Sequence, residues 1–333
     1  MSSAQHKPAT TTTIQAINMA LDEAMRLDPE VILLGEDVGD EQEGGVCGVT
    51  KGLSTKYGKS RVRTTPISEQ AIVGAAIGAA IAGMRPVAEI MLMNFTAVAM
   101  DMIVNHAAKL RFMSGGQTHV PLTIRTMTGA GFGTGGQHSD YLEAWFAHTA
   151  GIKVVAPSSP AESYGLMLSC IFDDDPCLFI ENMPTYWTPG ASPDLGKRIP
   201  LGKANVVLPG SDVTLISYSR AVSDCIAVAK TFANQGVSAE VIDLRTISPL
   251  DMDTVLTSVM RTRRAVVVHE AVKPFGVGAE IAARLHEGLF GDLAAPVQRV
   301  GAYYCAVPFS NKLEMEFIPT HARIEAAVRA TLG

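Results

Sequence analysis

The sequence predicts an α/β protein made of two doubly wound domains, and three observations lead to this class. Short apolar runs typical of buried strands alternate with stretches whose apolar residues recur at helical spacing. Around residues 188–200 the alternation stops in a segment rich in proline and glycine, which indicates a linker. The length of 333 residues suits two domains, each with its own core. We therefore expect domains over residues 14–190 and 206–333, joined by a linker over 191–205.

Composition narrows the classes of function. The formal net charge of −6 argues against nucleic acid or an anionic membrane as a main partner. Residues 1–13 are polar and contain no arginine, so we expect a disordered N-terminus without a secretion signal or transit peptide. The five cysteines are scattered and lack CxxC spacing, which is typical of reduced thiols in the cytoplasm rather than of disulfides or a zinc site.

The elements of the first domain follow from the periodicity of apolar residues. Ile14, Ile17 and Leu21 fall at helical spacing, so residues 14–27 predict an amphipathic helix. An apolar run over residues 31–34 predicts a short buried strand, and the acidic, glycine-rich segment 39–48 predicts a loop. Later segments predict helices over 105–113 and 161–172, and strands over 121–127, 152–155 and 177–181.

The second domain repeats this alternation. Strands are expected over residues 212–218, 239–244, 265–269 and 297–300. Helices are expected over residues 221–233, 251–260 and 278–288, and from His321 onward. Strands that alternate with helices in this way form a parallel sheet with helices on both faces.

The stretch from residue 64 to 95 organises the first domain. Its centre, residues 71–84, is almost entirely Ala, Gly, Ile and Val and predicts a helix that ends at Gly83, before a buried strand over residues 87–92. Gly74, Gly78 and Ala82 lie four residues apart and would let another helix approach closely. A soluble helix this apolar is expected to be buried on all sides, either in the core or at a subunit interface.

Glu69 stands at the head of this apolar helix. The helix dipole favours the ionised form of a carboxyl group there, and apolar surroundings would strengthen a hydrogen bond from it to a ligand. A glutamate in a first helical turn is nevertheless ordinary. A catalytic role for Glu69 therefore needs support from the rest of the chain.

A glycine-rich segment over residues 131–136 fits G-x-G-x-x-G and follows a predicted strand, so a dinucleotide site must be weighed. The residues after it give no clear helix start, and Ala156 and Pro157 stand where such a site needs an acid, about twenty residues on. We therefore interpret the segment as a glycine loop that presents His138, because polar loops often carry function.

Two further groups of polar residues have open interpretations. His269 and Glu270 end a predicted strand, where contacts to a ligand or partner are common in α/β folds, and a solvated strand end is the alternative. Asp173 and the two acids after it could bind a cation, although acids before a proline more often form a solvated turn.

Short motifs along the chain, taken as a set, resemble one known family. They include Gly35-Glu36-Asp37-Val38, Thr65-Pro66-Ile67-Ser68-Glu69, Gln137-His138-Ser139, Asp243-Leu244-Arg245-Thr246 and Gly276-Val277-Gly278-Ala279-Glu280. Over residues 12–331 the chain closely resembles the beta subunit of the thiamine-diphosphate-dependent first component of 2-oxo acid dehydrogenase complexes. This resemblance implies a pyrimidine-binding transketolase-like domain followed by a transketolase C-terminal-like domain. Residues 45–50, 124–127 and 157–160 are most similar to the acetoin dehydrogenase branch, and the short loop before Gly44 to pyruvate dehydrogenase.

The resemblance also implies roles for individual residues. Glu69 matches the glutamate that hydrogen-bonds a ring nitrogen of the cofactor's aminopyrimidine, which favours the tautomer that takes a proton from the thiazolium carbon. The resulting ylide attacks the substrate carbonyl, and the thiazolium then serves as electron sink. His138 matches a histidine that binds or protonates the intermediate. Residues expected to pack around the pyrimidine are Ile67, Met91 and Phe95. Residues that match a structural potassium site are Leu122, Cys170, Ile171, Asp173 and Asp175, the last in place of an asparagine.

One missing motif indicates a partner chain. Members of this cofactor class hold the diphosphate through Mg²⁺ with Gly-Asp-Gly, which does not occur in this sequence. The resemblance thus implies an alpha subunit that carries the Mg²⁺ half of the site, an α2β2 heterotetramer with a second copy of this chain, and a lipoyl-bearing acyltransferase as acceptor of the acyl group. Alternatives are a lipoyl-independent subunit that makes or cleaves acyloins, a catalytically silent structural subunit and, least favoured, a nicotinamide enzyme.

Overall fold

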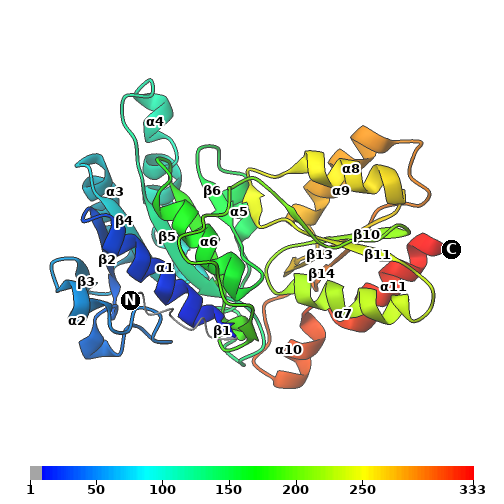
Figure 1. Cartoon of the computed structure of the whole chain (residues 1–333), viewed down its shortest axis with the longest axis horizontal. Helices are drawn as coiled ribbons and strands as arrows, with labels where there is room; N and C mark the ends of the chain where they lie inside the picture. Colours follow the sequence, from blue (N-terminus) through cyan, green and yellow to red (C-terminus); the bar gives the residue numbers. More distant parts are fainter. Residues whose placement is uncertain (1–9) are drawn as a thin grey trace, which may run out of the picture.

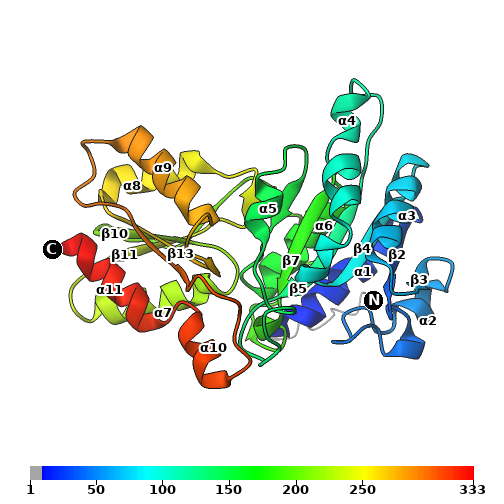
Figure 2. The same cartoon turned by 180° about the vertical axis from the view of Figure 1, so that it is seen from behind.

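The computed structural model describes residues 10–333, and these form two α/β halves that lie side by side (Figure 1). Each half contains a mainly parallel sheet with helices on both faces, which confirms the predicted fold class. Figure 2 shows the same arrangement from behind, with the C-terminal helix α11 (His321–Leu332) at the end far from the first half.

The first half is built on a seven-stranded sheet with the order β12-β6-β7-β5-β4-β2-β3. Its neighbouring strands are parallel, except for β12 against β6. The parallel strands all end at the same edge of the sheet, where ligands bind in open α/β folds. The strands are β2 (Val31–Glu36), β3 (Val62–Thr65), β4 (Arg85–Leu92), β5 (Thr123–Thr128), β6 (Lys153–Val155), β7 (Cys177–Asn182) and β12 (Thr246–Ser248).

Helices α1 (Thr13–Leu27) and α6 (Pro160–Ile171) pack against one face of this sheet. Helix α1 begins at a capping box, in which the Thr12 side chain accepts from the Gln15 N–H and the Gln15 side chain accepts from the Thr12 N–H. The other face is covered by α3 (Glu69–Ile81), the π-helical turn η3 (Met102–Ala107), α4 (Leu110–Met113) and α5 (Glu143–Ala147). The predicted helix over 105–113 is therefore two shorter helical segments.

The second half contains a five-stranded sheet with the order β14-β13-β10-β11-β9, in which only β9 runs antiparallel to its neighbour. Helices α7 (Ala221–Ala233) and α11 cover one face, and α8 (Met252–Thr262) and α9 (Val277–Leu289) cover the other (Figures 1 and 2). The strands are β9 (Asn205–Leu208), β10 (Val213–Ser217), β11 (Ala239–Asp243), β13 (Ala265–Val272) and β14 (Gln298–Ala302).

The two halves are joined by shared structure as well as by the chain. Strand β12 follows β11 of the second half in the sequence, yet it pairs with β6 and completes the first sheet. Ser158 donates a hydrogen bond to the buried carboxylate of Asp243 at 2.5 Å. The largest apolar core contains side chains of both halves, such as Ile180 and Ile216. The halves therefore form one packed body.

Short elements complete the chain between residues 10 and 333. They are β1 (Thr11–Thr12), which pairs antiparallel with β8 (Pro189–Gly190), η1 (Asp40–Gln42), α2 (Leu53–Tyr57), η2 (Met93–Ala97), η4 (Met183–Thr185) and α10 (Asn311–Phe317). The pairing of β1 and the start of α1 at Thr13 place residues 11–13 in the fold, where the sequence predicts disorder. The same prediction for residues 1–9 lies outside the described residues.

Helix α3 differs from its prediction in burial. Ile72, Val73 and Ile77 face the core, but Gly78 and Ile81 are exposed, Ile81 by 51%. The alternative of a helix enclosed in the core of this chain is therefore wrong, because nothing in the described residues covers its second face, and the subunit-interface alternative stays a prediction.

Candidate active site

Three predicted site residues, Glu69, Phe95 and His138, lie at the carboxyl edge of the first sheet together with Glu36. Strand β2 ends in Glu36, β3 leads to Glu69, β4 ends beside Phe95, and β5 leads into the loop that carries His138. The sheet order places these strands next to one another as β3-β2-β4-β5. Because the four strands are parallel, all four residues lie along one edge.

Glu69 is the first residue of α3 and is partly exposed. Its carboxylate makes no hydrogen bond or ion pair with another residue of the described chain. The nearby Glu36 carries a raised pKa because of burial first and then of the negative charges of Asp37 and Glu69. The edge therefore offers a free carboxylate within an acidic neighbourhood. Ile67, which precedes Glu69, has 73% of its surface exposed and so presents an uncovered apolar side chain beside it.

Phe95 and His138 contact each other. Their ring centroids lie 5.7 Å apart in an edge-to-face arrangement, although the residues come from different loops. His138 Nδ1 lies 3.2 Å from the carbonyl oxygen of Thr134 within its own loop. Asn94 ties the two loops together, since its side chain donates to the carbonyl of Gly136 at 3.1 Å and to the carboxylate of Asp140 at 2.9 Å.

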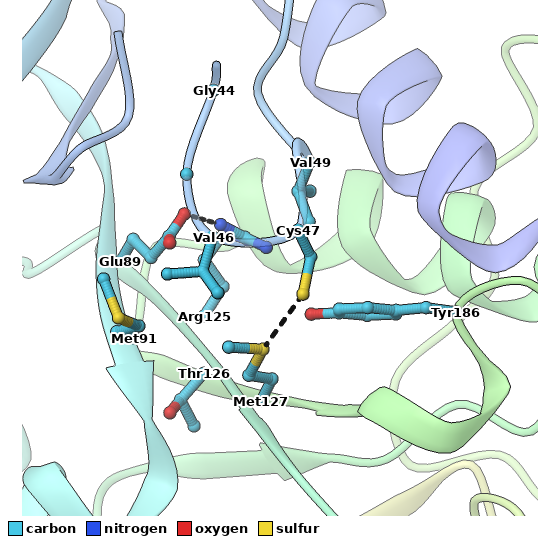
Figure 3. A pocket seen from close by; sticks show the side chains of 11 residues that line it. Gly44, Val46, Cys47, Val49, Glu89, Met91, Arg125, Thr126, Met127 and Tyr186 are labelled. Carbon is cyan, nitrogen blue, oxygen red and sulfur yellow. Dashed lines mark hydrogen bonds and ion pairs between the residues drawn. The ribbon is translucent and has the colours of Figure 1, made fainter. Parts of the chain in front are cut away.

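Met91 lies on β4 and lines a small internal cavity (Figure 3). Arg125 lines it too, and its guanidinium contacts Glu89 (Figure 3). Two other nitrogens of the guanidinium donate to Glu181, each at 2.7 Å. The hydroxyl of Tyr186 donates to Glu181 as well. Arg125 is 3% exposed, so its charge is balanced inside the protein and is not available to a ligand. The cavity volume of about 10 Å³ is too small for a cofactor.

The glycine loop is held by two carboxylates of the second half. Glu270, on β13, accepts the N–H of Ala130 at 2.8 Å. Glu314, on α10, accepts the N–H of Gly131 at 2.7 Å and that of Gly133 at 2.9 Å. In a dinucleotide-binding loop such N–H groups would face a pyrophosphate. Here the protein's own carboxylates occupy them, which argues against the nicotinamide interpretation.

His269, the residue before Glu270, belongs to the buried core of the second half. Its ring is fully buried, its Nδ1 lies 3.1 Å from the carbonyl oxygen of Ala271, and burial lowers its pKa to about 4. A Cβ atom on Gly276 or Gly278 would lie within 2.8 Å of this ring, so these glycines make room for it. We therefore assign His269 to packing rather than to the candidate site.

The predicted potassium residues lie together, with protein cations among them. Lys153 places its ammonium 2.5 Å from Asp173 Oδ1 and 3.5 Å from Asp175 Oδ2, and Arg111 pairs with Asp175 at 2.6 Å. The backbone oxygens of this predicted site accept hydrogen bonds from protein donors, and each carbonyl keeps a second lone pair. The hydrogen-bonded pairs are Leu122 O with Cys177 N, Cys170 O with Asp173 N, Ile171 O and Asp173 O with Arg85 Nη1, and Asp175 O with Cys177 Sγ. Protein cations therefore supply the positive charge there.

Some residues of the site give no sequence signal. Asn94, Glu181 and Glu314 each belong to short stretches that fit no motif, and each has a partner far along the chain, at 42, 56 and 183 residues, respectively. Only the fold brings them to the carboxyl edge. Glu270 is the exception, because its place after the predicted strand over 265–269 already singles it out for a contact, although β13 continues to Val272.

Two features are absent from the described residues, a cluster of metal ligands and a membrane-spanning helix. No group of three or more His, Cys, Asp or Glu side chains could hold a metal ion. Residues 10–333 also contain no helix of the length and apolarity needed to cross a bilayer.

The carboxyl edge of the first sheet carries a free carboxylate, an aromatic-histidine pair and a glycine loop that the second α/β half holds in place. Two α/β halves with such an edge are typical of a transketolase-like protein. Two families match the chain, described as "Transketolase, pyrimidine binding domain" over residues 9–187 and "Transketolase, C-terminal domain" over residues 202–324. A solved structure of a split gene transketolase, an inactive beta4 tetramer, superposes with a TM-score of 0.78 at 22% identity and covers 96% of this chain and 98% of its own.

Curated relatives narrow this class further. The chain is 47% identical to acetoin:2,6-dichlorophenolindophenol oxidoreductase subunit beta of Cupriavidus necator, over 95% of this chain and 96% of the relative. It is 41% identical to the subunit of the same name from Bacillus subtilis, over 96% of both chains. It is also 41% identical to the mitochondrial pyruvate dehydrogenase first-component subunit beta of Homo sapiens, over 97% of this chain and 90% of the relative. The chain therefore belongs to the beta subunits of the acetoin and pyruvate dehydrogenase family, with transketolase-like domains.

Proposed function

We propose that this chain is the beta subunit of a cytoplasmic, thiamine-diphosphate-dependent dehydrogenase that cleaves acetoin or a 2-oxo acid. The observation that carries the proposal is the Glu69 carboxylate, which has no partner within the described residues and lies at the edge where Phe95 and His138 meet. When bound, thiamine diphosphate would supply a carbon nucleophile and an electron sink. Glu69 would hold the aminopyrimidine through a hydrogen bond that also moves a proton, and Met91 and Phe95 would pack against its ring. Ile67, exposed beside Glu69, would add apolar cover.

His138 would act on the substrate side of this site. Its Nδ1 is near the Thr134 carbonyl, so the ring is fixed and its Nε2 is left to exchange a proton with a developing alkoxide. The edge-to-face contact with Phe95 holds the ring at the place where the substrate would sit.

A neutral substrate fits the charges that this chain contributes. Glu36 and Glu69 make the edge acidic, and the buried cation Arg125 is fully paired. An acidic edge repels the carboxylate of a 2-oxo acid, whereas it leaves an acyloin such as acetoin unaffected. We therefore rank acetoin above pyruvate, in line with the 47% identity to the acetoin enzyme's beta subunit.

We propose that the chain is active only as part of an α2β2 heterotetramer. The sequence lacks Gly-Asp-Gly, so an alpha subunit would hold Mg²⁺ and the diphosphate. A second copy of this chain and a lipoyl-bearing acyltransferase would be the other partners. The exposed face of α3 is available for one of the subunit contacts. The two rivals, a lipoyl-independent acyloin enzyme and a silent subunit, differ in where the acyl group goes and in whether turnover occurs.

A binding titration tests the shared site. Thiamine diphosphate with Mg²⁺ is titrated into this chain alone and into the chain co-purified with its alpha subunit, followed by turnover with acetoin, pyruvate and branched 2-oxo acids. We expect tight binding only in the pair and the highest turnover with acetoin. Tight binding to the lone chain would contradict the shared site, and a pair without turnover would favour the silent subunit. Acyl transfer to a lipoyl domain separates the dehydrogenase from the lipoyl-independent enzyme.

A further inference from the structure

The segment between β5 and His138, which contains the glycine loop, is held in place by residues of the second half of the chain. Three of its N–H groups, those of Ala130, Gly131 and Gly133, donate to Glu270 and Glu314. Both carboxylates are buried, Glu314 completely and Glu270 to 7% exposure. Hydrogen bonds from N–H groups to a buried carboxylate are stronger than those between neutral groups. The loop is therefore held at its start by two charges that come from elsewhere in the sequence.

Packing adds to this hold further along the loop. A Cβ atom on Gly135 would lie 2.4 Å from the ring of Phe309, so the ring lies directly on the glycine backbone. Gly131, Gly133 and Gly135 all have positive φ angles, which L-residues with side chains rarely adopt. The loop thus has a shape that only glycine permits and that the segment around Phe309 and Glu314 fits.

The far end of the loop carries His138. Its N–H donates to the carbonyl of Gly135 at 3.2 Å, and its Nδ1 faces the carbonyl of Thr134. The position of the imidazole therefore depends on the backbone of residues 134–135, which depends in turn on the contacts to Phe309 and Glu314. Each step of this dependence is a direct contact.

We propose that Glu314, supported by Glu270 and Phe309, positions His138 for catalysis, so that the second half of the chain sets the geometry of the active-site loop. This inference rests on the proposed function, because it gives His138 its role in turnover. Glu314 touches no substrate in this scheme and is a positioning residue. The second half therefore acts on the active site by holding the glycine loop, whose N–H groups bind carboxylates of the protein and not a phosphate.

Glu314→Gln in the α2β2 complex tests the proposal. The amide keeps one acceptor oxygen but turns its NH2 group toward an N–H of the loop, so one of the two hydrogen bonds is lost. We expect kcat to fall about 10- to 100-fold, because small misplacement of a catalytic group has effects of this size. Affinity for thiamine diphosphate and the assembly of the complex should be unchanged, since Glu69 follows β3, which lies three strands away from β5 and its glycine loop. Glu316→Gln, an exposed glutamate on the same helix, is the matched control and should keep full activity.

Two further readouts separate positioning from general stability. In a double-mutant cycle, Glu314→Gln should have little additional effect on kcat in a His138→Ala background, because the group it positions is gone. Hydrogen exchange followed by mass spectrometry should show lost protection in residues 129–138 of Glu314→Gln and no change in helix α1. If Glu314→Gln does not assemble, Phe309→Ala serves instead, since that ring is 71% exposed and its loss should not unfold the chain.

The outcomes distinguish this inference from the proposed function. Full activity and unchanged loop protection in Glu314→Gln would overturn the positioning role. Equal losses of kcat in the wild-type and His138→Ala backgrounds would also overturn it. If the wild-type complex shows no thiamine-dependent turnover, the proposed function fails, and loop exchange in Glu314→Gln still decides whether the second half holds the loop.

Discussion

The ammonium of Lys153 lies 2.5 Å from a carboxylate oxygen of Asp173, within the group of residues that the sequence predicts as a potassium site. Burial opposes the charged form of Lys153, but the hydrogen bond and charge of Asp173 outweigh it and raise the pKa of the lysine. The side chains are 25% and 23% exposed, so water screens the pair only in part. A lysine therefore stands where an ion would neutralise the same carboxylates.

This relationship predicts that the protein does not need K⁺ for stability. Replacing K⁺ by Na⁺ in the buffer should leave the melting temperature and the activity unchanged. Lys153→Met should lower the free energy of unfolding by about 1–3 kcal/mol, because Asp173 and Asp175 lose their shared cation. Denaturant unfolding in both salts measures the two effects.

Lys197→Met is the control for this experiment. Its ammonium pairs with Asp194 at 3.6 Å on the surface, and both side chains are more than 60% exposed. Exposed pairs contribute little, so the change in stability should stay within about 0.5 kcal/mol. A melting temperature that rises with K⁺ in the wild type would show that an ion binds in addition to Lys153.

A second prediction concerns the pH dependence of stability. Glu143 on α5 is fully buried, and burial raises its pKa from 4.5 to about 7, while the hydroxyl of Tyr218 donates to it at 2.6 Å. Between these two pKa values the folded chain keeps a proton that the unfolded chain releases. The contribution of Glu143 to stability is therefore complete below the unfolded pKa and is lost as pH rises through the folded pKa.

Glu143→Gln removes this titration, because the amide resembles the protonated carboxyl. At about pH 8 the variant should be more stable than the wild type by up to about 3 kcal/mol, and near pH 4.5 the difference should approach zero. Urea unfolding at several pH values measures it. Glu287→Gln, an exposed glutamate on α9, should show no such trend. A stability difference independent of pH would mean that Glu143 is ionised in the folded chain throughout this range.

The sequence was sufficient for the parts of the fold that depend on local pattern. Helix α1 and strand β13 lie within a few residues of their predicted bounds, because apolar periodicity and strand composition are local properties. Strand β12 was not predicted, because its three residues gain their strand conformation only by pairing with β6. The choice between core and interface for α3 stays open from sequence, since composition cannot distinguish the two, and only the structure shows that one face is exposed.

The site shows the same division. Glu69 and His138 could be named as candidates because they lie in motifs and at the ends of predictable elements. The contacts of Glu314 with Gly131 and of Arg125 with Glu181 join residues 183 and 56 positions apart, respectively. The first pair forms when the two halves pack together, and the second forms when β5 and β7 pair within one sheet. Neither arrangement can be read from a single sequence.

A third prediction tests the exposed face of α3 as a subunit contact. A Cβ atom added at Gly78 would meet no atom of this chain within 4 Å, so a leucine there is accommodated in the isolated subunit. Leucine also favours helix over glycine by about 0.5–1 kcal/mol. Gly78→Leu should therefore keep or slightly raise the melting temperature of the lone chain while it blocks assembly with its partners.

Size-exclusion chromatography with light scattering measures this effect on assembly. Ala233→Leu, an exposed position at the end of α7, is the matched control and should assemble normally. An intact heterotetramer of Gly78→Leu would show that this face of α3 is not a close subunit contact. Loss of folding in the lone chain would instead show that the helix needs its glycine for packing within the subunit.

The last prediction concerns Glu69 itself. Glu69→Gln keeps the size and hydrogen-bonding capacity of the side chain but removes its ability to give and take a proton. Since the carboxylate has no partner in the described residues, the variant should fold and assemble as the wild type does. Turnover by the α2β2 complex should fall by at least about 100-fold, the size expected for loss of acid–base catalysis. Glu41→Gln, an exposed glutamate paired with Lys59, is the control and should keep its activity. Undiminished turnover in Glu69→Gln would remove Glu69 from the mechanism, and with it the main support for the proposed cofactor.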